Sequence, residues 1–138
     1  MRKVEVQFER GGSFVIELLE DEAPKTCEGI LKALPVHNSE ARHARFGGQE
    51  FYTHLRVGEA GPENQVKRAR GDVAFNPDPD WCALIIYYGD SLAEPRPGGH
   101  YFNKVGRITS GLEELEAVGE RIWLKGAENL SLRLLSEA

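Results

Sequence analysis

The chain of 138 residues contains 41% hydrophobic and 28% charged residues, with 15 glycines and 7 prolines. This length and balance predict one globular domain over residues 1–138 that is rich in turns and neither disordered nor fibrous. The 17 basic and 22 acidic residues give a net charge of −5, so the chain lacks the basic surplus that phosphate backbones and anionic membranes attract. We therefore expect neither nucleic acid nor a membrane as a partner.

The start of the chain and its two cysteines indicate the compartment. Residues 1–5 lead directly into an alternating pattern without the apolar core of a signal peptide. No stretch approaches the roughly 20 apolar residues of a membrane span. Cys27 and Cys82 each lie in an apolar segment, which is typical of buried thiols and not of a disulfide framework. We expect a cytoplasmic protein with two reduced, buried cysteines.

The N-terminal third predicts a hairpin followed by a short helix. Hydrophobic residues alternate with polar ones over 4–8 and again over 14–18, and Gly11-Gly12 between them permits a tight turn. Apolar residues then recur at helical spacing over 24–34, and Pro35 ends the pattern. This change of period predicts an amphipathic helix over 24–34 that packs on a sheet.

The middle of the chain predicts short strands separated by loops. Residues 41–55 indicate two strands around Gly47-Gly48, and the polar stretch 58–71 indicates a loop. Residues 72–75 indicate a brief strand. The nearly continuous apolar run 83–88 is typical of a central strand that is buried on both faces.

A second helix is predicted near the C-terminus. Ser110 and Glu113 have the spacing of a capping box, which marks the start of a helix. Leu112, Leu115 and Val118 line one face of this segment. We expect the helix to occupy residues 111–118 and to end at Gly119.

Strands and a loop surround this second helix. Residues 91–99 form a predicted loop, and β-branched and aromatic residues over 100–109 indicate a strand. Residues 122–124 and 130–134 indicate two closing strands. The order of about eight strands and two helices is incompatible with alternating βαβ winding. The expected fold class is therefore mainly β, a closed barrel of about eight strands capped by two α-helices.

Motifs for cofactors and metals are absent from the sequence. The glycine pairs lack the spaced third glycine or the Gly-Lys-Ser/Thr ending of a phosphate loop. The four histidines show neither helical i, i+4 pairing nor a Cys-x-x-Cys companion. Residues 76–80 place oxygen donors at alternate positions, but Trp81 stands where a calcium loop needs glycine. We expect a solvated turn there, no metal and no cofactor.

Two further segments have a functional and a structural interpretation. The basic run 67–70 has acidic neighbours in a net anionic chain, so we interpret it as a solvated loop and not as a nucleic-acid patch. Cys82 precedes an apolar strand, which favours a buried structural thiol over a nucleophile. No spacing fixes two acidic or histidine side chains together as a catalytic pair.

The segment 43–52 carries the main candidate for binding. An arginine and aromatic residues alternate there beside a glycine pair, and such a wall of guanidinium and ring faces can hold a carbonyl or carboxylate. The alternative is a barrel strand with an outward arginine and inward aromatics. The segment 100–102 has the same two interpretations. The candidate ligand-binding residues are Arg45, Phe51, Tyr52, His100 and Phe102.

Segments spread over most of the chain resemble the cyclophilin-like barrels. The stretch 14–26, ending in Pro24-Lys25-Thr26, looks like the cyclophilin strand that leads through an acidic turn into the first helix. Residues 71–76 are similar to the segment that brings a strand to the active-site groove, and residues 105–112 resemble the run before the second helix. A closer likeness, to small bacterial cyclophilin-like proteins of uncharacterised function, is carried by residues 43–48, 99–102 and 123–130. The resemblance implies a cyclophilin-like barrel.

The resemblance transfers the isomerase machinery only in part. Arg45 falls where the catalytic arginine of peptidyl-prolyl isomerases would lie, although residues 43–44 replace the Phe-His before it. The Phe-Met-x-Gln-Gly-Gly segment is replaced near 50–52, the glutamine of the Ser-Gln-Phe-Phe strand is lost at 82–85, and the tryptophan-containing lining is reduced to 98–100. These losses imply that efficient isomerase activity is gone.

Three functions follow from the sequence, in order. The first is binding of a small polar metabolite or an extended peptide in a groove beside Arg45. The second is weak peptidyl-prolyl isomerisation, in which Arg45 is catalytic and stabilises the twisted amide. The third is regulation or assembly of a metabolic enzyme without catalysis. The expected partner is a small molecule or peptide, and the sequence leaves homo-oligomerisation open.

Overall fold

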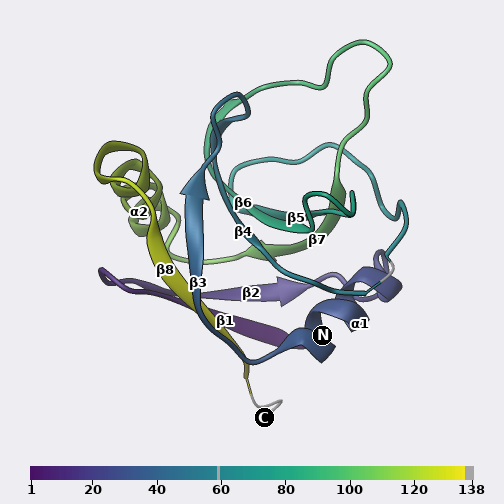
Figure 1. Cartoon of the computed structure of the whole chain (residues 1–138), viewed down its shortest axis with the longest axis horizontal. Coiled ribbons are helices and arrows are strands. Elements are labelled where there is room, and N and C mark those ends of the chain that lie inside the picture. Colours follow the sequence, from purple (N-terminus) through teal and green to yellow (C-terminus); the bar gives the residue numbers. More distant parts are fainter. Residues whose placement is uncertain (59, 136–138) are drawn as a thin grey trace.

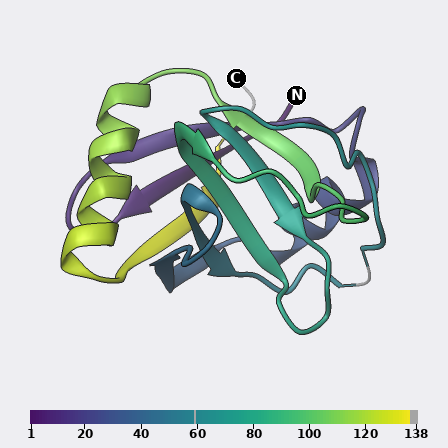
Figure 2. The ribbon, with the colours of Figure 1, turned by 90° about the horizontal axis from the view of Figure 1, so that it is seen from above.

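A closed barrel of eight strands, with one helix near each end, forms the molecule (Figures 1 and 2). The computed structural model describes residues 1–58 and 60–135. The helices are α1 (Pro24–Ala33) and α2 (Leu112–Lys125). The strands are β1 (Lys3–Phe8), β2 (Ser13–Leu18), β3 (Val36–His43), β4 (Gly48–His54), β5 (Asp72–Asn76), β6 (Ala83–Leu92), β7 (Asn103–Ile108) and β8 (Glu128–Leu134). The expected fold class, a mainly β closed barrel of about eight strands with two helices, is confirmed.

The N-terminal hairpin closes the barrel. All neighbouring strands are antiparallel, in the order β1-β2-β7-β5-β6-β4-β3-β8. In β1, Val6 lies opposite Phe14 of β2 and opposite Leu132 of β8. The period-2 alternation of β1 directs Val4, Val6 and Phe8 to the interior, where each is at most 3% exposed. The alternation that predicted the hairpin therefore also builds one side of the core.

Large aromatic rings fill the part of the interior that supports the β3–β4 end of the barrel. Phe51 contacts Phe8 and Tyr88, with ring centroids 5.6 and 5.9 Å apart. Both Phe51 and Tyr88 are at most 2% exposed. Burial of each such side chain contributes about 1.5–3 kcal/mol. This end of the barrel is consequently a rigid base for the loops that leave it.

Strand β6 is covered on both faces, as its apolar run predicted. Leu84, Ile86 and Tyr88 join the interior core. The alternate residues of the same strand point outward and form a second cluster, together with Ala74 and the partly buried side chains of Tyr52, Leu92 and Phe102. The outer members of β6 are Ala83, Ile85 and Tyr87. Apolar burial on the outside of a barrel wall requires cover, and the irregular segments beside it supply that cover.

The two cysteines differ from each other in burial. Cys27 in α1 is 1% exposed, and burial raises the pKa of its thiol to about 12. The expectation that Cys82 is buried is wrong, because its side chain is only partly buried. Cys82 ends the turn before β6 with φ +43, and its amide donates to the carbonyl of Asp78. This backbone conformation takes its side chain out of the strand pattern.

Helix α2 is longer than its sequence pattern predicted. The expected end at Gly119 and the expected strand over 122–124 are both wrong, because the helix continues to Lys125. Gly119 lies so close to the ring of Tyr88 that an added Cβ would be 2.3 Å from it. The glycine is thus a contact point for close packing, and Ile122 is buried one turn later. Gly126 follows the helix as its C-cap with φ +93, a backbone conformation that favours glycine.

The predicted capping box at the start of α2 is also wrong. Gly111 occupies the N-cap position with φ +76, and no side chain caps the helix. Glu113 and Glu114 lie in the first turn, where their charges favour the positive end of the helix dipole. The acidic residues therefore stabilise this helix start by charge and not by a reciprocal hydrogen bond.

Two strand boundaries differ from those predicted. Strand β3 starts at Val36 and not at Ala41, since Val36 already pairs with Leu132 ahead of a register shift. Strand β7 starts at Asn103, so His100 and the two residues after it belong to the preceding loop. Figure 1 shows this β6–β7 segment arching away from the strands it connects. The turn over 76–80 is confirmed, with the amide of Asp78 donating to Asn76 Oδ1 at 3.1 Å.

Candidate functional site

A pocket of about 260 Å³ lies where the β3–β4 loop meets α2. Its lining combines polar, charged and aromatic side chains that come from β3, β4, β6 and α2. The lining residues are His43, Ala44, Arg45, Gly48, Gln49, Tyr88, Glu120 and Trp123. We call it the Arg45 pocket. The rigid aromatic core beneath β4 and β6 holds its floor in place.

A fixed His43–Tyr88 pair forms the floor of the Arg45 pocket. His43 Nδ1 lies 2.7 Å from the carbonyl oxygen of Ala44, and Nε2 lies 2.6 Å from the Tyr88 hydroxyl. Because a carbonyl oxygen only accepts, Nδ1 carries the hydrogen, and on the neutral ring Nε2 accepts from Tyr88. Burial raises the pKa of Tyr88 to about 12, with smaller contributions from Glu120 and Glu116. The phenol therefore remains a donor at neutral pH.

An aromatic wall borders this floor. The ring of Trp123 lies 4.6 Å from the ring of His43 and is tilted by 54° to it. Trp123 is nevertheless 58% exposed. A large ring that is held in place by one contact and otherwise open to solvent can stack on a flat ligand.

Opposite charges stand on different sides of the Arg45 pocket. Arg45 is exposed in the β3–β4 loop, and its guanidinium forms no ion pair or hydrogen bond with any residue that the structure describes. Glu120 on α2 accepts a hydrogen bond of 3.3 Å from Gln49 Nε2. The amide of Ser91 donates to Gln49 Oε1 at 2.9 Å, which fixes the Gln49 side chain. The pocket thus offers a free cation and an oriented carboxylate.

The five residues predicted from sequence do not all converge. Arg45 alone lines the Arg45 pocket. Phe51 is completely buried inside the barrel, whereas Tyr52 and Phe102 pack on the outer cluster of β6. His100 is exposed in the β6–β7 loop, where its Nδ1 lies 3.0 Å from the carbonyl oxygen of Tyr101. The residues predicted to line one groove therefore lie in separate places: inside the barrel, on its outer wall and in loops.

Several lining residues were missed by the sequence analysis because α2 was expected to end too early. Glu120 and Trp123 lie beyond Gly119, and Trp123 was assigned to a strand. The signal that identifies them is the continued helical spacing of Leu115, Val118 and Ile122, all of which are buried. Tyr88 was predicted only as part of a buried strand, with no role for its hydroxyl.

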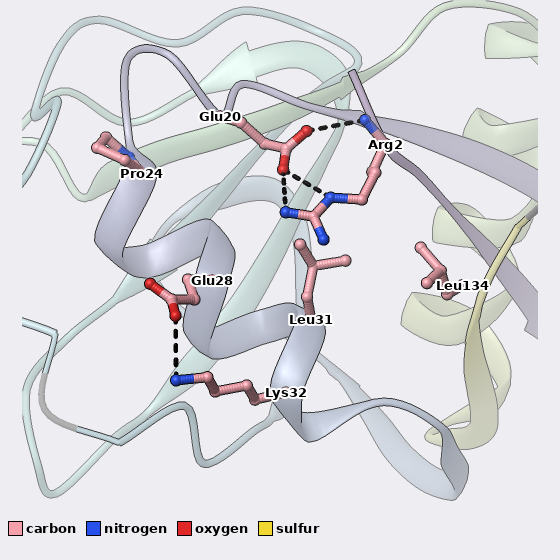
Figure 3. Close-up of a pocket in the computed structure, with 7 residues that line it drawn as sticks. All are labelled: Arg2, Glu20, Pro24, Glu28, Leu31, Lys32 and Leu134. Carbon is pink, nitrogen blue, oxygen red and sulfur yellow. Dashed lines mark hydrogen bonds and ion pairs between the residues drawn. The ribbon is translucent and has the colours of Figure 1, made fainter. Parts of the chain in front are cut away.

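Other pockets are larger but offer less convergent chemistry. Figure 3 shows one of about 510 Å³ beside α1, in which Arg2 pairs with Glu20 and Lys32 pairs with Glu28. Another, of about 810 Å³, includes Cys82 and is lined mainly by glycine, proline and small apolar residues. Neither combines an unpaired charge with an aromatic wall and a fixed hydrogen-bonding pair. The Arg45 pocket is therefore the stronger candidate.

Within residues 1–58 and 60–135, no group of three histidine, cysteine, aspartate or glutamate side chains is close enough to hold a metal ion. No helix in this part of the chain is both long and apolar enough to cross a membrane.

Comparison with solved structures finds the same fold in other proteins. The structure of McbB in complex with tryptophan matches with a TM-score of 0.74 and 19% identity, covering 98% of this chain and 45% of McbB. The chain thus spans less than half the length of McbB. The solution structure of the hypothetical protein AF2241 from Archaeoglobus fulgidus matches with a TM-score of 0.66 and 24% identity, covering 96% and 93% of the two chains.

Comparison with sequences identifies a family. No curated protein matches the chain. The family described as protein of unknown function DUF3830 matches residues 7–134, which is nearly the whole length. The chain therefore belongs to the DUF3830 family.

Proposed function

We propose that the Arg45 pocket binds a small organic molecule that carries a carboxylate and a flat ring. The observation that supports this most is the unpaired Arg45 guanidinium beside the rigid wall of Trp123 and His43. A guanidinium presents its donors in a planar fork that fits a carboxylate. The volume of about 260 Å³ is below the roughly 300–1,000 Å³ of pockets for drug-sized ligands. An amino-acid-sized ligand therefore fits better than an extended peptide.

The remaining polar groups favour a zwitterion. Glu120 can accept from an ammonium group, and Gln49 holds its carboxylate in one orientation. Trp123 supplies a stacking surface for the ring of the ligand. The fold neighbour McbB was solved with tryptophan, a molecule that has all three features. Tryptophan is therefore the first probe for this pocket.

We further propose that the barrel is a cyclophilin-like one that works as a binding module. The closed antiparallel barrel with one helix near each end supports this, as do the segments that resemble cyclophilins. On the outer wall near β6, the partly buried side chains of Tyr52 and Phe102 pack on an apolar cluster that lies apart from the lining of the Arg45 pocket. This separation of the apolar surface from Arg45 supports ligand binding without prolyl isomerisation.

The experiment compares tryptophan with two analogues that each lack one charge, tryptamine and indole-3-propionate, by calorimetric titration. We expect tryptophan to bind saturably. Arg45→Ala should weaken tryptophan and indole-3-propionate at least tenfold, about 1.4 kcal/mol, and leave tryptamine unchanged. Arg56→Ala removes an exposed arginine outside the pocket and serves as the matched control. No saturable binding by any of the three probes, or equal binding by Arg45→Ala, would contradict the proposal.

A further inference from the structure

A second arginine, Arg68, is held on the outside of the barrel wall. The expectation that the basic run 67–70 is a solvated loop is wrong for this residue, because its side chain is only 8% exposed. Its guanidinium carbon lies 5.3 Å from the ring centroid of Tyr87 and 5.3 Å from that of Tyr101. Arg68 also donates to the carbonyl oxygen of Ala93 and lies 3.7 Å from a carboxylate oxygen of Glu94. Two rings and a carbonyl thus surround one guanidinium.

A buried carboxyl group faces the same cluster. Glu50 of β4 pairs in register with Tyr87 and is 8% exposed. Its carboxyl forms no hydrogen bond and no ion pair with any other residue of the described chain. Burial raises the pKa of Glu50, and the charge of Arg68 opposes that rise. Arg68 is therefore the cation that compensates this carboxylate, although it does so without direct contact.

Gly47 in the β3–β4 loop approaches the carboxyl group of Glu50 closely. A Cβ added at Gly47 would be 2.2 Å from Glu50 Oε1. The carboxyl group thus lies beside the β3–β4 loop, on the strand position that pairs with Tyr87. Aromatic faces around a position with a nearby carboxylate are the arrangement by which proteins recognise organic cations.

Arg68 reaches this position from a segment that has few other inward contacts. Its neighbours Val66, Lys67 and Ala69 are exposed. The anchors of the same loop flank this segment, at Asn64, whose amide side chain donates to the carbonyl of Lys104, and at Gly71, whose amide donates to the carbonyl of Tyr87. Ala69 is itself held by two hydrogen bonds with Asp72, so residues 66–68 are the part of the loop that Arg68 holds against the barrel wall.

We propose that Tyr87, Tyr101 and Glu50 form a binding site for an organic cation, and that the chain's own Arg68 fills this site until a guanidinium or alkylammonium ligand displaces it. The ligand replaces the charge that Glu50 requires and the ring contacts that Arg68 makes. It also frees residues 66–68 from the barrel wall. The apolar outer surface of Ile85 and Phe102 adjoins Tyr87, so the ligand class extends to cations with an apolar body.

The test is chemical rescue of Arg68→Ala by methylguanidinium, measured as melting temperature and by calorimetric titration. Methylurea, which is uncharged and has nearly the same shape, is the control ligand. We expect Arg68→Ala to melt lower than the parent and to recover at least about 2 °C with saturating methylguanidinium. The parent protein should bind the ion at least about tenfold more weakly, because the tethered Arg68 competes at a high effective concentration.

Further variants make each outcome decisive. Glu50→Gln in the Arg68→Ala background should abolish the rescue, whereas Arg96→Ala, which removes an exposed arginine of the neighbouring loop, should neither lower the melting temperature nor create binding. Arg68→Gln keeps a donor for Ala93 and serves if Arg68→Ala does not fold. Equal rescue by methylurea, rescue that persists in the Glu50→Gln double variant, or no saturable binding by either Arg68 variant would overturn the proposal. Failure of both variants to fold in methylguanidinium would overturn it as well.

Discussion

Arg45 and Arg68 both extend from loops at the wall of the same barrel, yet their surroundings are opposite. Arg45 is exposed and unpaired above a hydrogen-bonded His43–Tyr88 floor that needs no charge. Arg68 is buried against tyrosine rings beside a carboxyl group that requires one. The difference teaches that the strand residue beneath a loop decides whether its arginine is available to a ligand. The groups of the floor bond to each other and leave Arg45 free, whereas two tyrosine rings, a carbonyl oxygen and the charge of Glu50 hold Arg68.

The largest expected effect on stability is that of Tyr88, which forms the floor of the Arg45 pocket with His43 and is not part of the Arg68 site. Tyr88→Ala should destabilise the protein by about 3–5 kcal/mol, because it empties a core position and removes the partner of His43. Tyr88→Phe should cost only about 1 kcal/mol, the net value of one hydrogen bond. Urea denaturation measures both changes. Similar losses for the two variants would show that the ring does not support this end of the barrel.

The next prediction contrasts the two arginines directly. Arg68→Ala should destabilise the protein by about 1–3 kcal/mol at neutral pH, since it leaves Glu50 buried without a compensating cation. Arg45→Ala should change stability by less than about 0.5 kcal/mol, as expected for an exposed side chain without partners. The free energies of unfolding in urea provide the comparison. Equal effects would remove the distinction between a retained and an available arginine.

A smaller, pH-dependent effect tests the carboxyl group alone. Glu50 has a pKa raised above its ordinary value of 4.5 in the folded state. The folded state therefore holds the proton of this carboxyl group more tightly than the unfolded state does. The resulting stabilisation is fully present below pH 4.5 and is lost as the pH rises through the folded-state pKa. The stability of Glu50→Gln relative to the parent should accordingly increase over that interval. Denaturation midpoints at a series of pH values measure it, and a constant difference would contradict the raised pKa of this buried carboxyl group.

The smallest expected effect is on prolyl isomerisation, where we expect no acceleration. A proline ring needs an open apolar pocket next to the guanidinium, and the apolar outer surface at Tyr52 and Phe102 lies apart from the lining of the Arg45 pocket. The uncatalysed reaction takes roughly 10–100 s at 25 °C, so even modest catalysis is visible in stopped-flow traces. A rate increase that disappears in Arg45→Ala would favour the isomerase function, and one that persists would indicate a contaminating enzyme.

The sequence predicted the barrel better than the site. Alternation in β1 and β2 and the apolar run of β6 are local signals, and the structure confirms the elements they predicted. The end of α2 was not predictable from Gly119, because a glycine in a helical pattern can either end the helix or allow a ring such as that of Tyr88 to pack closely against it. Glu50 and Arg68 lie 18 positions apart in the sequence, and no spacing rule connects them. The two side chains come near each other because of the strand register of β4 and β6 and the path of the loop before β5, and both are properties of the folded chain.

The close approach of Gly47 to the carboxyl group of Glu50 has an evolutionary consequence. A side chain at position 47 would displace the carboxyl group from its present place, so we expect positions 47 and 50 to vary together among relatives. A relative with alanine or serine at the first position should carry a shorter residue at the second. Once the acid is lost, position 68 no longer needs a cation. Correlated substitution at these three positions is therefore the pattern that this small contact should leave in the family.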